Sequence, residues 1–494
     1  MERRAKIVAT LGPASDSEPV LGRLLRAGVD VVRLNLSHGS HEEHRARIAR
    51  VRRLADAQRR HVAVLFDLMG PRFRLGVIPD GSRLLRKGER VVLGEPGRGV
   101  DLPVDDPEFL GYLEPGERVL VDNGRVELRV NAKRRGRVEA RVVHGGPIAT
   151  RKGINIPDTD LPFTISRKDR ADLAFAVAEG ADYLAASYIG RGEELERLRA
   201  EARRTGRELP IVAKLERARA IDHLDEIAEA ADAVMVARGD LGVEMPLDEV
   251  PVLQKRIVAA GRRLGKPVIV ATQMLESMID QPRPTRAEAS DVANAVFDGA
   301  DALMLSGETA AGRYPVETVR TMERIIVQAE RYRWAPGQRE GWAAGPERPL
   351  SPGVTEKLSE RDTHLEVADV VCSSAVHAAT QLGAKCIVAF SQGGFTARMI
   401  ARYRPAVPIV VFTNDPGVAR RMQLVWGVYP ALVDEQVEDV TAVVRVVDRK
   451  LLAALLVRPG DPVVILMGDP IRDRPLTNLL RVHRVRRGTR RHGS

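Results

Sequence analysis

The sequence of 494 residues lacks several features that would place it in a special class of protein. It has only two cysteines, too few for a disulfide framework, so both are expected to be reduced in a core, as in a cytoplasmic protein. No stretch approaches the roughly 20 apolar residues of a membrane span, and no apolar targeting segment follows Met1. Aromatic residues make up only 4%, which argues against base-stacking platforms for nucleic acid.

Positive charge, in contrast, is in excess. The formal net charge is +10, and the extra basic residues are arginines spread along the whole chain. A small concentration stands near the end of the sequence, at Arg484, Arg486, Arg487, Arg490 and Arg491. We interpret this distribution as a well-solvated surface that would also suit an anionic small substrate, and we expect no nucleic-acid or membrane partner.

Short apolar runs alternate with longer amphipathic segments, which is the pattern of an α/β protein with a parallel sheet and crossover helices. Eight runs predict strands at residues 6–12, 29–36, 61–68, 183–187, 210–215, 233–237, 267–271 and 302–306. Eight βα units that close on themselves form a (β/α)8 TIM barrel, which carries its chemistry on the loops after the strands. An open doubly wound sheet is the alternative, but no G-x-G-x-x-G follows the first strand.

Two stretches depart from this rhythm and divide the chain into domains. The barrel is expected over residues 1–75 and 161–332. Residues 76–160 read as short strands with tight turns and predict an inserted small β-barrel domain, placed to act as a lid over the catalytic face. Residues 333–365 are rich in Pro, Gly and charge and predict a linker. Residues 366–494 then predict a C-terminal α/β domain.

Polar side chains follow the carboxyl ends of the predicted strands. Two of them, Lys214 and Glu216, are two residues apart, so they would face the same side and project together into the barrel mouth. The alternative is that Lys214 and Glu216 form an ion pair with a structural role only. Asp240 ends the next strand, and two carboxylates from neighbouring strands suit Mg²⁺ or Mn²⁺, which also take water and substrate oxygens as ligands. Metal, lysine and the backbone amides near Gly239 together fit phosphoryl transfer.

Longer stretches of the sequence resemble the pyruvate kinase family over nearly the whole chain. The matching segments are residues 6–15, 32–39, 236–244, 271–279, 282–288 and 305–310. The resemblance implies a phosphotransferase that moves the phosphoryl group of phosphoenolpyruvate to ADP, giving pyruvate and ATP in the last step of glycolysis. It also implies a homotetramer and a requirement for Mg²⁺ or Mn²⁺.

The same resemblance implies roles for individual residues. Glu216 and Asp240 would bind the divalent ion, Lys214 and Arg33 would neutralise the phosphoryl group, and Thr272 would help to deliver a proton to the enolate carbon. The groups that would line the substrate are Arg33, Ser187, Lys214, Gly239, Asp240 and Thr272. Those that would face the nucleotide are Asn35, His38, Arg74 and Lys152.

The end of the third strand departs from the family pattern Asp-Thr-Lys-Gly-Pro-Glu-Ile-Arg, because residues 67–74 read Asp-Leu-Met-Gly-Pro-Arg-Phe-Arg. In potassium-activated members the glutamate accompanies a bound K⁺. The ligands of that ion match Asn35, Ser37, Asp67 and the carbonyl of Leu68. Arg72 stands at the glutamate position, and a tethered guanidinium can supply the charge that a mobile cation otherwise brings. We therefore expect Arg72 to replace K⁺ and the enzyme to work without K⁺. The alternative is that arginine at this position has no effect on function.

The C-terminal domain departs further from the family. Members commonly bind a phosphorylated effector on a hydroxyl-rich loop, whose counterpart here is Ser-Gln-Gly-Gly-Phe-Thr at residues 391–396. Ser391 and Thr396 retain hydroxyls, and Arg398 would supplement them as a phosphate ligand. A sugar phosphate or a nucleotide monophosphate effector stays open on this basis.

Two other functions also stay open. A barrel aldolase or lyase of the phosphoenolpyruvate–pyruvate group would share the metal carboxylates, but it would not need the inserted lid or Arg74. A regulatory homologue without activity is the second alternative. The presence of Lys214, Glu216, Asp240 and Thr272 together argues against it.

Overall fold

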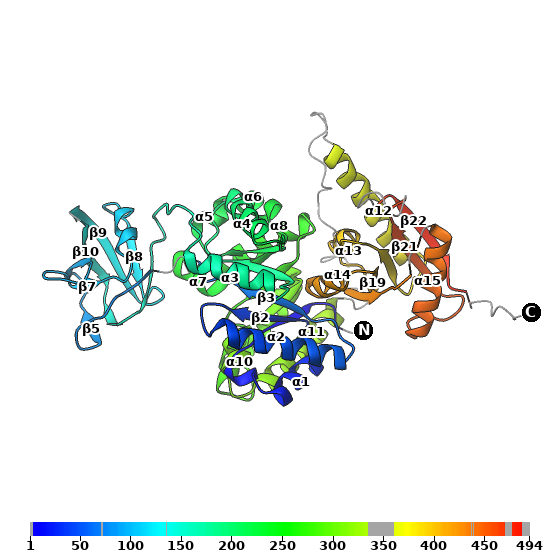
Figure 1. Ribbon diagram of the computed structural model, residues 1–494, viewed down its shortest axis with the longest axis horizontal. Coiled ribbons are helices and arrows are strands. Elements are labelled where there is room, and N and C mark those ends of the chain that lie inside the picture. Colours follow the sequence, from blue (N-terminus) through cyan, green and yellow to red (C-terminus); the bar gives the residue numbers. More distant parts are fainter. Residues whose placement is uncertain are drawn as a thin grey trace, which may run out of the picture.

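The computed structural model describes residues 3–70, 73–134, 136–333, 360–435, 437, 439–469 and 477–486, without the side chains of 360–363. Eight parallel strands close into a barrel in the order β1-β17-β16-β15-β14-β13-β3-β2. A curled β sheet is inserted after β3, and an α/β sheet follows the barrel, so the three parts lie in a row (Figure 1). The predicted barrel with an inserted β domain and a C-terminal α/β domain is confirmed, and the open doubly wound sheet is excluded.

Each barrel strand lies within two residues of its predicted position. The strands are β1 Lys6–Thr10, β2 Val31–Asn35, β3 Ala63–Asp67, β13 Tyr183–Ala186, β14 Ile211–Leu215, β15 Ala233–Ala237, β16 Val268–Ala271 and β17 Ala302–Leu305. The main helices around them are α1 Glu18–Arg26, α2 His41–Ala57, α3 Arg167–Ala178, α4 Gly192–Arg204, α6 Leu224–Ala230, α8 Val250–Arg263, α9 Arg286–Asp298 and α11 Pro315–Arg333. Parallel strands covered on both faces are apolar along their whole length, which is why they were easy to predict.

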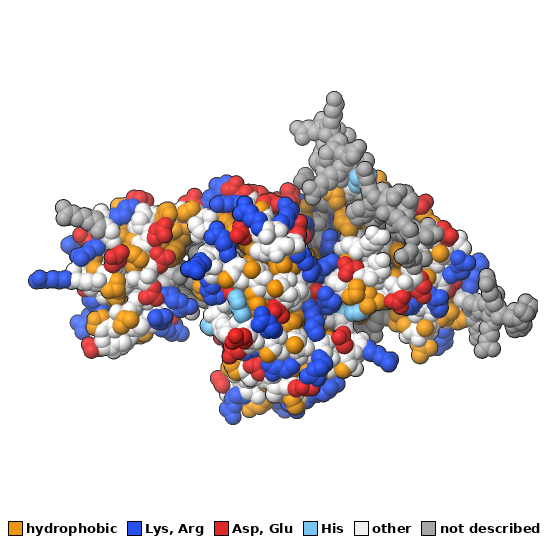
Figure 2. All heavy atoms as spheres, in the orientation of Figure 1, with side chains coloured by type: hydrophobic (Ala, Val, Ile, Leu, Met, Phe, Trp, Pro, Cys, Tyr) orange, Lys and Arg blue, Asp and Glu red, His pale blue; other side chains and the backbone are white. Residues whose placement is uncertain are grey.

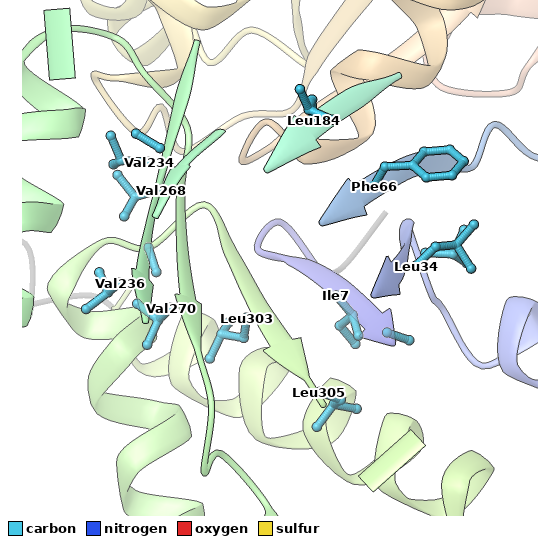
Figure 3. Packing of buried hydrophobic residues seen from close by; sticks show 14 of the residues in the cluster. Ile7, Leu34, Phe66, Leu184, Val234, Val236, Val268, Val270, Leu303 and Leu305 are labelled. Atoms are coloured by element: carbon cyan, nitrogen blue, oxygen red, sulfur yellow. The ribbon is translucent and has the colours of Figure 1, made fainter. Parts of the chain in front are cut away.

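Alternate residues of each strand divide the barrel core into two layers. The outward layer, which includes Ile7, Phe66 and Val236, packs under the helices (Figure 3). The inward layer, which includes Val8 and Met235, fills the barrel interior. Full burial of one such side chain stabilises the fold by about 1.5–3 kcal/mol, so the interior is a packed core and only the strand ends are free for chemistry.

The inserted part is a seven-stranded sheet in the order β4-β12-β8-β9-β10-β6-β7, with a separate pair β11-β5. Its strands are β4 Phe73–Arg74, β5 Ser82–Leu85, β6 Arg90–Gly94, β7 Leu102–Pro103, β8 Arg118–Val121, β9 Val126–Arg134, β10 Arg137–His144, β11 Gly146–Ala149 and β12 Gly153–Asn155. A bridge between Leu75 and Val104 joins the two edges, so the sheet curls around its own core. Asp122, Asn123 and Gly124 have positive φ and form the tight turn between β8 and β9.

The C-terminal part holds a five-stranded sheet in the order β20-β19-β18-β21-β22, in which only β22 is antiparallel to its neighbour. Its strands are β18 Ile387–Phe390, β19 Ile409–Thr413, β20 Val428–Leu432, β21 Pro462–Met467 and β22 Leu479–Arg484, and its main helices are α12 Glu360–Gln381, α13 Phe395–Ala401, α14 Pro416–Arg421 and α15 Val440–Ala453. Of the linker expected over 333–365, residues 334–359 lie outside the described part, and α12 begins at Glu360. Both cysteines are buried and unpaired. No described helix is long and apolar enough to cross a membrane.

The C-terminal part closes the amino end of the barrel. Leu424 packs with the inward-facing barrel residues. Lys6 Nζ donates to the carbonyl of Val428 at 2.7 Å, and the hydroxyl of Tyr183 donates to the carbonyl of Arg421 at 3.0 Å. The carboxyl ends of the strands therefore form the open mouth, on the side where barrel enzymes bind their substrates.

A buried ion pair fastens this contact. The guanidinium of Arg404 lies 2.9 Å from both carboxylate oxygens of Asp301, and it also donates to the carbonyl of Gly299 at 2.6 Å. We expect Arg404→Met to lower the free energy of unfolding by about 3–5 kcal/mol, because it leaves the Asp301 carboxylate buried without its cation. Scanning calorimetry should show a lower first transition. The control Arg263→Met, which removes the partner of Asp225 from a largely exposed pair, should leave that transition in place.

Candidate active site

Lys214 is the central cation of the barrel mouth. It lies near the end of β14 and is buried, with its Nζ 2.6 Å from Glu216 Oε1 and 3.3 Å from Asp67 Oδ1. The same ammonium donates to Ser187 Oγ at 2.7 Å. Lys214 and Glu216 are two residues apart, so their side chains lie on the same side of the chain, and the ion pair between them is consistent with that spacing.

The protonation states in this cluster depend on the balance between burial and charge. Burial by itself lowers the pKa of Lys214, but the carboxylates of Asp67 and Glu216 outweigh it, so the pKa lies above that of an ordinary lysine. Burial raises the pKa of Asp67, and the charges of Lys214 and Arg33 overcome it, so this pKa is lowered. Lys214 and Asp67 are therefore both charged at neutral pH.

Arg33, from β2, completes the cationic side of the mouth. Its guanidinium binds the Asp67 carboxylate, with Nε at 2.7 Å and Nη2 at 2.6 Å from Oδ2, and Nη1 donates to Thr10 Oγ1 at 3.1 Å. Asp67 thus lies between the two cations and fixes both of them. Four strands, β1, β2, β3 and β14, contribute to this arrangement, which gives two positive groups of defined position beside the space where a substrate phosphate would lie.

Thr272 stands at the other side of the mouth in an unusual backbone conformation. Both Thr272 and Gln273 have left-handed φ values, of 70° and 52°. For residues other than glycine such a conformation costs of the order of 1–3 kcal/mol and persists only where neighbours enforce it. The hydroxyl of Thr272 donates to the carbonyl of Ala271 at 2.6 Å and accepts from the amide of Gly239 at 2.8 Å. This turn therefore aims the Thr272 side chain at the start of α7 Arg238–Glu244.

Arg238 enforces the strained turn, a role that the sequence did not reveal. Its Nη2 donates to the carbonyls of Thr272 at 2.6 Å and Gln273 at 3.3 Å, and its Nη1 lies 2.8 Å from Asp291 Oδ1. We expect Arg238→Met to reduce kcat by roughly 10²-fold with a smaller change in KM for the substrate, because a small displacement of Thr272 disturbs the reacting geometry and not the charges that bind the anion. Steady-state kinetics measure this split.

The matched variant for this prediction is Asp291→Asn. It keeps a hydrogen-bond partner for Arg238 and removes only the negative charge of residue 291. Asp291→Asn should lose much less kcat than Arg238→Met. Equal kcat in Arg238→Met and in the unaltered enzyme would show that Thr272 needs no support from Arg238.

Glu216 and Asp240 are the carboxylates that fit a divalent ion. Burial raises the pKa of Glu216; Lys214 opposes this shift, and the nearby charge of Asp240 adds to it. These two carboxylates repel each other at the open mouth. A bound Mg²⁺ or Mn²⁺ would relieve that repulsion and would take the carboxylate oxygens as ligands. Among the described residues no group of three or more His, Cys, Asp or Glu is placed to hold a metal. Substrate oxygens and water would therefore complete the coordination.

Most residues predicted for the nucleotide and the monovalent cation make hydrogen bonds or ion pairs within the described structure. Arg74 and Lys152 lie at the base of the inserted sheet, where Arg74 Nη1 donates to the carbonyl of Arg151 at 3.0 Å and Lys152 Nζ lies 2.9 Å from Asp122 Oδ1. His38 is exposed. Asn35 Oδ1 accepts from the amide of Ser37, and the Leu68 carbonyl accepts from Ser187 Oγ. Arg72 lies outside the described residues.

The predicted effector loop in the C-terminal part is closed on itself. Ser391 and Thr396 are both buried. Ser391 Oγ accepts from the amide of Gly394 at 3.0 Å, and the hydroxyls of Thr396 and Thr477 lie 2.7 Å apart. Arg398 follows on α13 and is not hydrogen-bonded to either hydroxyl in the described structure.

The closed barrel, its capped amino end and the charged cluster at its mouth define an α/β-barrel enzyme that acts on an anionic substrate. Comparisons with known proteins specify the family. The pattern of the pyruvate kinase barrel domain matches residues 2–319, and that of the pyruvate kinase alpha/beta domain matches residues 369–483. These two matches together cover more than two thirds of the chain, which therefore belongs to the pyruvate kinase family.

Full-length relatives agree with this assignment. The pyruvate kinase of Geobacillus stearothermophilus is 41% identical over 497 residues, which cover 98% of this chain and 80% of that protein. The pyruvate kinase of Mycobacterium tuberculosis is 43% identical over 489 residues, which cover 98% and 99% of the two chains. A crystal structure of a pyruvate kinase from Cryptosporidium parvum superimposes with a TM-score of 0.86 at 30% identity, over 98% of this chain and 96% of that one.

Proposed function

We propose that the barrel mouth carries out the pyruvate kinase reaction with Lys214 as the cation that neutralises the phosphoryl group during transfer from phosphoenolpyruvate to ADP. One observation carries this proposal: Lys214 is buried between Asp67 and Glu216, and its pKa is raised, so it keeps its charge. Charge neutralisation at a fixed position is the main requirement of phosphoryl transfer. Arg33, held by Asp67, supplies the second positive group.

The remaining substrate contacts follow from the geometry of the same mouth. Glu216 and Asp240 would hold the divalent ion, which screens the charges of the substrate phosphate and carboxylate when it is bound. The backbone amide of Asp240, at the start of α7, would face the substrate carboxylate, while the amide of Gly239 stays bonded to the Thr272 hydroxyl. The hydroxyl of Thr272 would lie beside the enolate carbon and help to bring the proton there, directly or through water.

The nucleotide would bind between the mouth and the inserted sheet. Asn35 and His38 follow β2, while Arg74 and Lys152 lie side by side at the base of the insert, where Arg74 pairs in register with Gly153. Polyphosphate binding by these two cations would draw the insert toward the mouth and exclude water from the transfer. A homotetramer is supported by family membership alone.

We also propose that this enzyme works without K⁺. The third-strand sequence has Arg72 where potassium-activated members have glutamate. In addition, Asp67 already has two cationic partners within the protein, and the carbonyl of Leu68 already accepts a hydrogen bond. A guanidinium fixed in the chain would supply the positive charge that K⁺ brings elsewhere.

The test is ADP phosphorylation by phosphoenolpyruvate with Mg²⁺, measured in K⁺ and in tetramethylammonium at one fixed ionic strength. We expect ATP formation at the same rate in both salts, because the charge of Arg72 is covalently attached. Arg72→Glu should make the rate depend on K⁺. Strong activation of the unaltered enzyme by K⁺ would refute potassium independence, whereas an absence of ATP formation in both salts would refute the proposed reaction itself.

A further inference from the structure

The loop that follows β2 is bonded from outside the barrel by a side chain of α3. Residues 36–40 form this loop, and it includes His38, one of the residues that would face the nucleotide. Lys168 lies in the first turn of α3, and its Nζ donates to the carbonyl of Leu36 at 2.7 Å. Figure 2 shows histidine side chains at the surface where Figure 1 places α2 and α3. The two bonded residues are 132 apart in the sequence, so tertiary contacts fix the position of the loop.

Asp172 keeps the ammonium group of Lys168 in place. It lies one turn further along α3 and is buried, and one of its carboxylate oxygens accepts a hydrogen bond from Lys168. Its other oxygen lies 2.7 Å from Nε2 of His41, the first residue of α2. The ring of His41 stacks on that of Phe175, with the ring centroids 4.2 Å apart. An exposed lysine loses rotamer freedom when it bonds a single carbonyl, and the buried carboxylate reduces this cost because it orders the side chain beforehand.

A second side chain bonds the same loop from α2. His44 is buried, and its Nε2 lies 2.8 Å from the carbonyl of His38. Burial lowers the pKa of His44, although the hydrogen bond to this carbonyl opposes the shift, so the ring is neutral at neutral pH and Nε2 donates. Lys168 and His44 thus hold the loop backbone at two carbonyls, one on each side of Ser37. The side chain of His38 stays exposed and free to contact a ligand.

The cation that ends β2 is fixed independently of these contacts. Arg33 belongs to the strand that leads into the loop, but its guanidinium is bonded to Asp67 and to Thr10. Both of these partners lie on barrel strands and not on α3. Loss of the bond from α3 would therefore displace the loop after β2, while Arg33 would keep its place beside the substrate phosphate.

We propose that Lys168 and Asp172 are positioning residues that hold the loop after β2 in the conformation that binds ADP. The inference rests on the reaction proposed above, in which Asn35 and His38 face the nucleotide. Lys168 acts through the carbonyl of Leu36 and does not need to touch ADP itself. Without this bond the loop would sample other positions, and the apparent affinity for ADP would fall with the fraction of molecules in the binding conformation.

The experiment compares Lys168→Met and Lys168→Arg with the unaltered full-length enzyme. Calorimetric titration with ADP and Mg²⁺ should show about tenfold weaker binding to Lys168→Met, because this variant loses a charge-assisted hydrogen bond to the loop backbone. The KM for ADP should rise by the same factor, while kcat at saturating ADP and the KM for phosphoenolpyruvate should stay within about twofold. Lys168→Arg should recover most of the ADP affinity, since a guanidinium can also donate to a carbonyl.

Arg170→Met is the matched control, because Arg170 is an exposed cation on the same helix and pairs with Glu201 on α4 at 3.2 Å. It removes one positive charge from α3 and should leave the ADP affinity unchanged. The inference is overturned if Lys168→Met binds ADP as tightly as the unaltered enzyme, or if its KM for phosphoenolpyruvate rises as much as its KM for ADP. An unaltered enzyme that binds no ADP would instead overturn the proposed reaction, and this inference with it.

Discussion

Lys214→Met is expected to lower the turnover of phosphoenolpyruvate and ADP by about 10³- to 10⁵-fold, the effect of losing a cation that stabilises a transferring phosphoryl group. Methionine has a similar length and fills the same space, so the variant removes the charge and largely keeps the packing. Since the pKa of Lys214 is raised, its charge is fully present below the ordinary lysine pKa. No loss of turnover from its deprotonation is therefore expected in that pH range.

A coupled assay of ATP formation measures this prediction, together with the thermal midpoint of the variant. The thermal midpoint shows whether the variant is still folded. This must be known because Asp67 and Glu216 lose their shared cationic partner, which destabilises the barrel mouth. Lys255→Met is a suitable control, since Lys255 on the outer helix α8 forms an ion pair with Asp298 at the end of α9, away from the barrel mouth. Near-normal turnover in a folded Lys214→Met enzyme would remove Lys214 from the mechanism.

Removal of the divalent ion by a chelator is expected to abolish turnover, and added Mg²⁺ or Mn²⁺ should restore it. The physical reason is that the carboxylates of Asp67, Glu216 and Asp240 outnumber the two cations Lys214 and Arg33, so negative charge is left at the mouth. Glu216→Gln and Asp240→Asn should therefore each weaken Mn²⁺ binding by at least about 10- to 100-fold, the loss seen even for residues that support metal ligands indirectly. Titration of the protein with Mn²⁺ measures this affinity without any need for activity.

Glu244→Gln provides the matched control for the metal experiment. Glu244 lies on the same short helix as Asp240, and burial raises its pKa to about 7. At neutral pH this carboxyl is already partly protonated, so the glutamine variant changes little of its charge and should bind Mn²⁺ like the unaltered enzyme. If Glu244→Gln weakened Mn²⁺ binding and Glu216→Gln did not, the metal would have to lie nearer the inserted sheet than we propose.

The sequence predicted the barrel strands well and the C-terminal sheet less completely. Buried parallel strands are uninterrupted apolar runs, so all eight barrel strands can be recognised as short apolar segments in the sequence. In the C-terminal part, apolar runs at residues 386–391, 408–413 and 463–468 predict β18, β19 and β21. No such run marks β20, which contains Pro430 and is only half buried, or β22, an edge strand with arginine and histidine among its residues. Lys214 and Glu216 could be placed at the mouth because the two-residue period of a strand determines which side chains share a face.

The sequence by itself determined the fold class, the family and the side chains that reach the barrel mouth, because each of these follows from short-range periodicity or from contiguous motifs. Only the tertiary structure decided how those side chains are held. Asp67 between Arg33 and Lys214, Arg238 on the carbonyls of Thr272 and Gln273, and Lys168 on the carbonyl of Leu36 all join segments that are distant along the chain. Such contacts depend on barrel closure, and no local pattern of residues encodes them.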